Sequence, residues 1–253
     1  MLPAKDEVDE ERAVIDPRRL PGDPEIDHPI ILTLFEPFYE LIRKSLKLRK
    51  SSSAQLRLPA MSWCTTAVEG QPLSLFGTPL GAPQAALILE RVIAMGARTI
   101  VVLGCCGSLQ PGITVGQLVV PTGALSEEGT SVHYPLPAGH VPGADTEITR
   151  LFLEAAQQHG LTATPGRVWT TDALFRETRG KIRRYAESGL LAVEMEISAL
   201  FTVAAFRGVR VGGCLVVSDE LGSLKWRPGF ANPAFHDASR KAARLAIEVC
   251  RRL

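Results

Sequence analysis

The sequence predicts an α/β protein with a three-layer architecture, in which helices flank a mixed, mostly parallel central sheet. Two observations support this class. The chain has 253 residues, of which 45% are hydrophobic and 22% charged, enough for one substantial core. Short apolar runs alternate along it with amphipathic helical patterns, as is typical of α/β folds. In such folds, small ligands bind at the carboxyl ends of strands.

Six apolar or β-branched runs are predicted as buried strands. They are PIILTLF (29–35), LSLFG (73–77), TIVVLG (99–104), QLVVPT (117–122), GRVWTT (166–171) and VRVGGCLVVS (209–218). Helical patterns separate most of them, and several end on glycine, as helix C-termini prefer. These patterns are APQAALILERVIAMG, DTEITRLFLEAAQQHG, RGKIRRYAESG, MEISALFTVAAFRG and NPAFHDASRKAARLAIEVCRRL.

Residues 1–27 are charged and rich in proline, which predicts an extended or poorly ordered arm. Residues 28–253 are then a single domain, because the tract SSSAQ (51–55) is too short for a domain linker. The N-terminus has no apolar signal region, and no run is long enough to span a bilayer. We therefore expect a cytoplasmic protein without a membrane partner.

Charge and cysteine content narrow the choice of partner. A formal net charge of +1 gives no field of one sign to attract nucleic acid, so the expected partner is a small molecule. The five cysteines contain no CxxC pair, so a metal site or a redox motif finds no support. We expect them to be reduced thiols in the core.

The stretch LLAVEMEISALF (190–201) places Glu194 and Glu196 on either side of Met195 in an apolar run. Burying an unpaired carboxylate is costly. In one interpretation both acids open a helix, whose macrodipole favours them there. In the other, strand alternation turns both to one side, where sugar hydroxyls donate to them. The stretch alone leaves both interpretations open.

Two glycine-rich turns follow predicted strands. In GTPLGAPQAA (77–86) the glycines free the backbone to approach an anion at the start of a helix, although a turn without a ligand fits equally well. GCCGSL (104–109) ends another strand and leads into the loop and strand GITVGQLVVP (112–121). Both turns are candidate binding sites.

These segments resemble the nucleoside phosphorylase family, which includes purine nucleoside phosphorylase, uridine phosphorylase and related nucleosidases. GCCGSL and GQLVVP are similar to its GTCGSL and VGDIVVP segments, AVEMEISAL to VEMEAAAL, and VVSDEL to the VSDH segment of purine-cleaving members. With WTTDALF (169–175), the match covers roughly residues 70–221 in order. The resemblance implies a three-layer α/β fold, a homo-oligomer, and cleavage of a nucleoside N-glycosidic bond without a metal or redox cofactor.

The resemblance also implies roles for residues. It assigns the 2′- and 3′-hydroxyls of ribose mainly to Glu196, with Met195 packed against the sugar and Glu194 beside it. It assigns the base to a set of three residues: Phe175, Ser218 and Asp219.

Asp219 would be the general acid, because a purine leaves readily only when its N7 is protonated. A turn or helix cap is the alternative for Asp219, and an ordinary core position is the alternative for Phe175.

The family's phosphate pocket maps onto Gly81, Gly104 and Cys105, and here the chain departs from the pattern. The usual arginine before the GTCG turn is Val102, and the usual hydroxyl residue is Cys105. LPGDP (20–24) resembles the family's first phosphate loop, but no strand precedes it and no arginine follows. We interpret it as unrelated to phosphate.

The nucleophile is therefore open. Phosphate would depend on main-chain donors and on a cation such as Arg43, late in the helix EPFYELIRKS, or one from a neighbouring subunit. We expect phosphorolysis of a nucleoside, with purine as the expected base and phosphate as co-substrate. Hydrolysis by water is the first alternative, and a nucleoside-binding protein without activity is the second. A dinucleotide-dependent oxidoreductase finds no support, because no G-x-G-x-x-G follows a strand.

Overall fold

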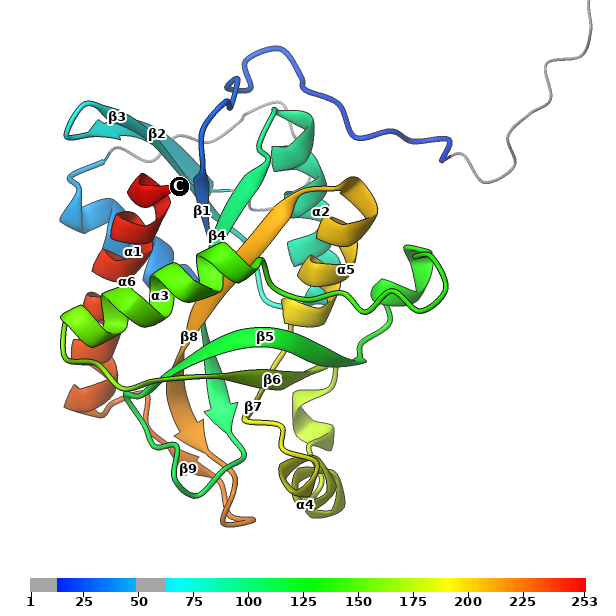
Figure 1. Ribbon diagram of the computed structural model, residues 1–253, viewed down its shortest axis with the longest axis vertical. Helices are drawn as coiled ribbons and strands as arrows, with labels where there is room; N and C mark the ends of the chain where they lie inside the picture. Colours follow the sequence, from blue (N-terminus) through cyan, green and yellow to red (C-terminus); the bar gives the residue numbers. More distant parts are fainter. Residues whose placement is uncertain (1–12, 49–61) are drawn as a thin grey trace, which may run out of the picture.

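The computed structural model describes residues 13–48 and 62–253 (Figure 1). The first twelve residues of the predicted arm and the SSSAQ tract lie outside these ranges. The strands are β1 (Ile30–Thr33), β2 (Ser62–Val68), β3 (Gln71–Gly77), β4 (Thr99–Ser108), β5 (Leu118–Glu127), β6 (Ala163–Thr171), β7 (Ala192–Glu194), β8 (Arg210–Glu220) and β9 (Arg227–Pro228). The helices are α1 (Glu36–Ser45), α2 (Ala82–Ala94), α3 (Thr146–Gln158), α4 (Arg179–Glu187), α5 (Ile197–Arg207) and α6 (Pro233–Arg252), with short 3-10 turns η1 (Ser131–His133) and η2 (Leu174–Arg176).

The prediction of a mixed, mostly parallel sheet covered by helices is confirmed. The strand order is β2-β3-β1-β4-β7-β6-β5-β8-β9. Most of the paired length is parallel, as in β1 with β3 and β4, β4 with β8, and β6 with β5 and β7. Helices α2 and α5 cover one face, and α1, α3 and α6 cover the other (Figure 1).

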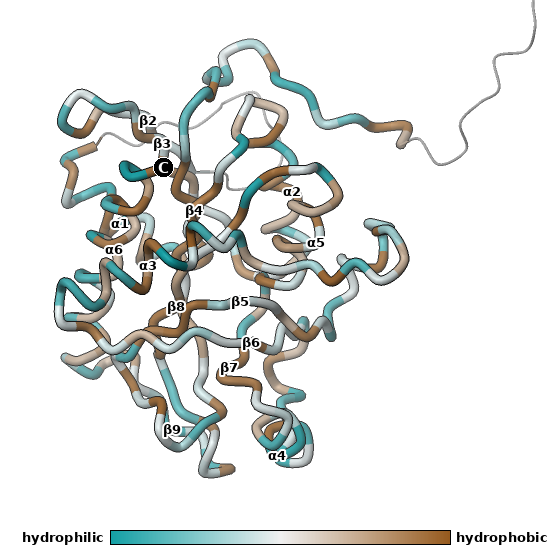
Figure 2. Tube along the Cα trace, in the orientation of Figure 1, coloured by the Kyte–Doolittle hydropathy of each residue, from teal (hydrophilic) through white to brown (hydrophobic). Residues whose placement is uncertain are grey.

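Alternation along the central strands builds a core on each face. Ile100 and Val102 of β4 pack in the cluster with α2 and α5. Val101 and Leu103, their neighbours, pack in the cluster with α1, α3 and α6. All four are fully buried, as expected of a strand covered on both sides. Figure 2 shows hydrophobic residues along β7 and β8 and hydrophilic residues on α4.

The sheet differs from the central layer of a three-layer sandwich because part of it closes on itself. β8 pairs in parallel with β4 and also in antiparallel with β5, so β4, β7, β6, β5 and β8 form a ring. Glycines let β8 turn this corner, since a Cβ on Gly213 would lie 2.4 Å from the carbonyl oxygen of Val102, and one on Gly212 would lie 2.7 Å from Ile148. The central sheet is therefore a barrel over these five strands and is extended by β1, β2, β3 and β9 outside it.

The end of the predicted arm is part of the core. Ile26 is 2% exposed, and its N–H donates to the carbonyl of Met95 at 2.9 Å. The LPGDP stretch precedes β1 as a turn, where Asp23 accepts from Leu20 N–H and pairs with Arg91 of α2. Residues 13–25 otherwise run over the surface without helix or strand (Figure 1).

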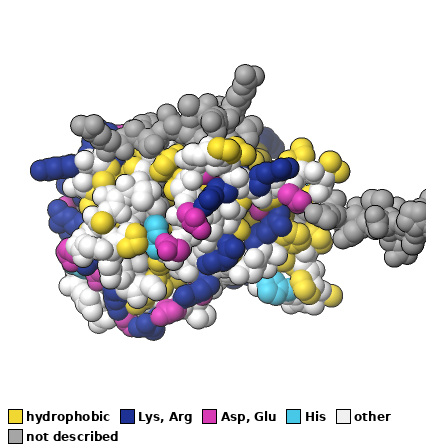
Figure 3. Space-filling view, turned by 90° about the horizontal axis from the view of Figure 1, so that it is seen from above, with side chains coloured by type: hydrophobic (Ala, Val, Ile, Leu, Met, Phe, Trp, Pro, Cys, Tyr) yellow, Lys and Arg dark blue, Asp and Glu magenta, His cyan; other side chains and the backbone are white. Residues whose placement is uncertain are grey.

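Two further features concern the surface and the helix lengths. Figure 3 shows Lys and Arg side chains interspersed with Asp and Glu over one face of the molecule. Within the described ranges, no helix combines the length and apolar character needed to cross a bilayer.

Candidate active site

The candidate site forms where β4 and β8 end together. Their parallel register shifts between Cys106 and Gly107, so that Cys106 faces Val217 and Gly107 faces Asp219. Ser218 is the extra residue of this bulge, and its hydroxyl lies 3.1 Å from the carbonyl oxygen of Cys106. A bulge rotates the side chains that follow it, and here it sets the direction of Asp219.

Both oxygens of Asp219 have polar partners. Oδ1 lies 2.7 Å from the hydroxyl of Ser218, and Oδ2 accepts a hydrogen bond of 2.9 Å from the indole N–H of Trp226. The carboxyl lies over Gly107, where an added Cβ would be 3.0 Å from Oδ2 and 2.4 Å from Leu221. Only glycine fits at that position.

Glu194 closes β7 and holds the start of α5. One oxygen accepts from the hydroxyl of Thr170, and the other accepts from the backbone N–H of Glu196 at 2.6 Å and of Ile197 at 2.7 Å. Glu194 thus lies in β7 and not in the first turn of a helix, but both of its oxygens are engaged by the protein and one of them satisfies N–H groups at the helix start.

Glu196 occupies the N-cap position of α5 but is bound elsewhere. Its Oε1 accepts a hydrogen bond of 2.6 Å from the N–H of Gly81, at the start of α2. Gly81 has a φ of 106°, a conformation that favours glycine. Glu194 and Glu196 are 6% and 3% exposed. Burial raises the pKa of both carboxyls, and the charge of Glu194 raises that of Glu196 further. Met195 between them is half-buried.

Cys105 lies among these carboxyls. Burial raises the pKa of its thiol to about 12, and the charges of Glu196, Asp219 and Glu194 act in the same direction. The thiol is therefore neutral at physiological pH, and the groups that surround it are acidic. The prediction that the cysteines are free thiols agrees with the structure, in which Cys105 is half-buried and the other four are buried.

The remaining positions of the predicted phosphate pocket are apolar or engaged. Val102 is fully buried. Leu34 covers Gly104: a Cβ added to this glycine would lie 3.2 Å from the Cβ of Leu34. Arg43, offered as a cation for phosphate, has partners of its own, and its contact with phosphate stays a prediction. Its guanidinium is held on α1 by Glu40 at 2.6 Å and by the carbonyl of Leu48 at 2.8 Å.

Phe175 stands apart from the core. It lies on η2 and is 96% exposed, so the core alternative for this residue is wrong. Its ring is available at the surface, and its contact with a base stays a prediction.

Glu177, which follows η2, was not predicted as a site residue. Its carboxyl is half-buried and has no hydrogen bond or ion pair within the part of the chain that the structure describes. Burial, with the charge of Asp219 as a second cause, raises its pKa to about 7. It is thus a second carboxyl near the predicted general acid.

Glu128 was also missed. It is 5% exposed and accepts from the hydroxyls of Ser126 and Ser198, tying the end of β5 to α5. It follows another acid in the polar run LSEEGTS, a pattern typical of an exposed loop, so its burial could not be predicted.

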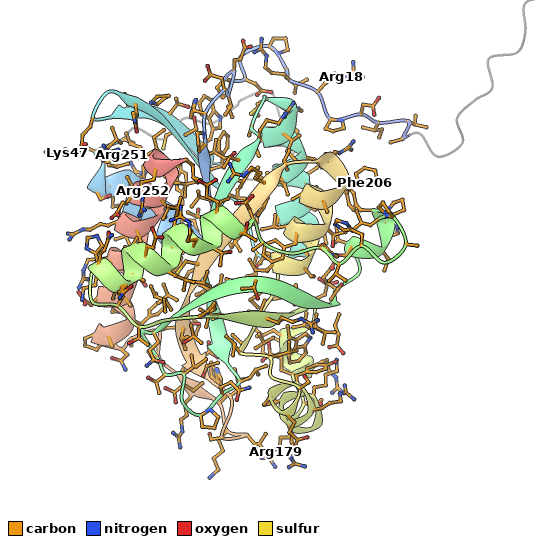
Figure 4. All side chains as sticks on the ribbon, in the orientation of Figure 1. Arg18, Lys47, Arg179, Phe206, Arg251 and Arg252 are labelled. Carbon is orange, nitrogen blue, oxygen red and sulfur yellow. The ribbon has the colours of Figure 1, made fainter. Side chains whose placement is uncertain are left out.

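A cleft of about 1420 Å³ lies elsewhere on the molecule, and Glu196, Cys105 and Asp219 are not among the residues that line it. Its walls come from the segment before β1, the exposed side of α2, the region of η1 and the end of α5. Arg18 and Phe206 line it, and Figure 4 shows both on the same side of the molecule, away from Arg179 at the start of α4. Pro83, which lines the cleft, is two residues from Gly81 in the sequence.

Across the described residues, no group of three His, Cys, Asp or Glu side chains is arranged to hold a metal ion.

Comparisons with known proteins agree with these features. Residues 47–253 match the family model described as the phosphorylase superfamily. The chain is 35% identical over 156 residues to the guanosine phosphorylase of Halorubrum lacusprofundi, covering 60% of this chain and 63% of that protein. It is 29% identical over 159 residues to a DeoD-type purine nucleoside phosphorylase of Bacillus cereus, covering 62% and 67%. The first match thus spans less than two thirds of that relative's length.

A solved structure has the same fold. The crystal structure of uridine phosphorylase from Vibrio fischeri ES114 superimposes with a TM-score of 0.76 over 89% of this chain and 92% of that one, at 23% identity. At this identity the likeness concerns the fold alone.

The raised pKa of Glu177 predicts a pH-dependent stability. A carboxyl with a pKa of about 7 in the folded protein and 4.5 ordinarily stabilises the fold fully below pH 4.5, and this contribution is lost as the pH rises through about 7. The Tm of Glu177→Gln should therefore fall less than the Tm of the wild type when the pH rises from about 5 to about 8. Glu187→Gln, an exposed change on α4, is the control and should follow the wild type. Identical slopes for wild type and Glu177→Gln would contradict the assignment.

Proposed function

The chain belongs to the phosphorylase superfamily, and from this premise we propose that it cleaves the N-glycosidic bond of a purine nucleoside by phosphorolysis, releasing the base and a sugar 1-phosphate. The observation that carries the proposal is the meeting of Glu196, Cys105 and Asp219 at the junction of β4, β8 and α5. A homo-oligomer in the cytoplasm is part of the proposal.

Glu196 is the group proposed to bind the sugar. Its buried carboxyl accepts one strong hydrogen bond, from Gly81, and burial raises its pKa. Two vicinal hydroxyls of a ribose supply donors that favour the ionised form, which relieves the cost of burial. Met195, half-buried beside it, offers an apolar surface for the sugar ring. Glu194 keeps the β7–α5 junction in place.

Asp219 is the proposed general acid. The Ser218 hydroxyl has one proton and lies within hydrogen-bonding distance of both the Cys106 carbonyl and Asp219 Oδ1. When it donates to the carbonyl, its oxygen can accept a proton from Asp219, so the geometry accommodates a protonated acid.

In the reaction the proton moves from Asp219 to N7 and the C1′–N9 bond breaks with its electrons going to the base. An oxygen of the nucleophile then bonds to C1′, whose positive charge peaks in the transition state.

Purine is the proposed base on two grounds. An acid positioned for N7 is useful only to a leaving group that has such a nitrogen. The printed names of two relatives, a guanosine phosphorylase and a purine nucleoside phosphorylase, agree with this choice.

Water is the second candidate for the nucleophile, and the charges around Cys105 favour it. The charges that act on the thiol come from Glu196, Asp219 and Glu194. The N–H of Gly81, which an anion could use, already donates to Glu196. A phosphate dianion would be repelled there unless cations arrive from elsewhere, whereas water is not. The same site would then be that of a nucleosidase.

A panel of nucleosides, assayed with and without phosphate, tests the proposal directly. Sugar 1-phosphate formed only when phosphate is present supports phosphorolysis. Free ribose formed at the same rate without phosphate replaces it by hydrolysis, and no base release from any nucleoside contradicts both.

Asp219→Asn should keep nucleoside binding and slow purine release by about two to four orders of magnitude, the usual effect of losing a general acid. Base release under single-turnover conditions measures the change. A rate equal to the wild type, on a purine that needs protonation, would remove Asp219 from the mechanism.

Glu196→Ala should lose discrimination between ribonucleosides and their 2′-deoxy counterparts, because the group that accepts from the sugar hydroxyls is gone. The ratio of kcat/KM for the two substrates measures this. Glu194→Ala is the comparison: it should change the ratio less and lower Tm, because its oxygens hold the start of α5. An unchanged ratio in Glu196→Ala would contradict the sugar contact.

Phosphate affinity should be in the millimolar range or poorer, equivalent to about 4 kcal/mol of binding, because Val102 and Cys105 occupy the positions that usually supply a guanidinium and a hydroxyl. Cys105→Ser should improve it modestly by supplying a hydroxyl donor. The KM for phosphate measures both effects, and a micromolar value in the wild type would contradict the account of the pocket.

A further inference from the structure

The hairpin formed by β8 and β9 carries the predicted general acid in its first strand. β9 pairs in antiparallel with the end of β8, with Asp219 opposite Pro228 and Glu220 opposite Arg227. The N–H of Gly229 donates to the carbonyl of Ser218 at 2.8 Å. The turn between the two strands carries Trp226.

The hairpin backbone is fixed from both sides. Glu220 accepts from the N–H of Val115 at 3.1 Å, and the N–H of Leu221 donates to the carbonyl of Ser108 at 2.9 Å. At Gly229 an added Cβ would lie 2.5 Å from Val115, so the second strand is closely packed too. The position of the Trp226 backbone is therefore determined by contacts outside its own side chain.

The Trp226 side chain is 64% exposed, so burial does not explain its position. Its specific polar contact is the 2.9 Å hydrogen bond from Nε1 to Oδ2 of Asp219. An indole N–H donates and cannot accept. A proton on the Asp219 carboxyl cannot therefore lie between Oδ2 and the indole, whereas a proton on Oδ1 finds the hydroxyl oxygen of Ser218 as an acceptor.

We propose that Trp226 is a positioning residue for the general acid: its indole N–H holds Oδ2 of Asp219, so that the transferable proton is carried by Oδ1. The inference rests on the proposed function, in which Asp219 protonates the base. Trp226 acts through Asp219 and takes no part in bond making.

Other ionisable groups interact with Asp219. The charge of Asp219 contributes to the raised pKa of Glu177. Cys105 and Cys106 of β4 also interact with Asp219, but burial raises the pKa of both thiols and keeps them neutral.

Trp226→Phe is the decisive variant, because it keeps an aromatic ring and removes the N–H. We expect kcat to fall by about tenfold with KM changed less than about twofold, which corresponds to losing one hydrogen bond. The acid must be protonated to act, so losing a donor to its ionised form should move the high-pH limb of the profile to higher pH. Glu177→Gln should move that limb to lower pH.

Trp63→Phe is the matched control. The Nε1 atom of Trp63 is buried without a hydrogen-bond partner, so the same substitution removes an N–H that donates to no described residue. Its pH profile should match that of the wild type. A Trp226→Phe enzyme whose limb stays in place, whether or not Tm falls, would overturn the proposal.

Fluorescence tests the contact without any activity. Subtracting the emission of Trp226→Phe from that of the wild type isolates Trp226, and this emission should change as Asp219 titrates. In Asp219→Asn the change should vanish, and a change that persists there would overturn the proposal. If Trp226 responds to Asp219 but no nucleoside is cleaved, the contact stands and the proposed function fails.

Discussion

The parallel pairing of β4 with β8 is the contact on which the rest of the molecule depends. It runs over the whole length of β4, closes the barrel because β8 also reaches β5, and joins the cores on the two faces of the sheet. The shift in its register between Cys106 and Gly107 sets Asp219 over a glycine. The same hydrogen-bonded ladder therefore fixes both the architecture and the position of the predicted acid.

The site concentrates carboxyls that have no ion pair with a Lys or Arg among the described residues, and the protein stabilises each differently. Glu194 receives a hydroxyl and two backbone N–H donors, whereas Glu196 receives one strong bond from Gly81. Glu177 receives none among the described residues, and burial raises its pKa. The acids with fewest internal donors are the ones that gain most from a ligand rich in hydroxyl and N–H groups, such as a nucleoside.

Sequence alone predicted the elements whose pattern is local. The apolar runs of β4 and β8 and the amphipathic helices are visible in the order of residues. The VEME and SDE segments pointed to Glu196 and Asp219 by resemblance to a family, and the family match confirms that resemblance for the chain as a whole. The closure of the barrel was not predictable, because it depends on close approaches at Gly212 and Gly213. Trp226 and Glu177 were missed for a similar reason: their roles come from a hairpin and a loop that bring them to Asp219 from separate parts of the chain.

In the predicted phosphate pocket, the absence of an arginine at Val102 goes together with a closed surface over Gly104. Without an arginine at Val102, an open anion pocket beside Gly104 would leave main-chain donors facing solvent with little attraction for a dianion. Instead, Leu34 covers Gly104, and its own N–H donates to the carbonyl of Leu103 at 2.9 Å, continuing the ladder beyond β1. The Gly81 N–H is likewise taken by Glu196. These donors, which an oxyanion could have used, are thus satisfied within the protein. A ligand that enters near Cys105 would therefore meet acceptors, which favours ligands with more donors. Water and the monoanion of phosphate each carry two O–H donors, whereas the dianion carries one and a larger negative charge.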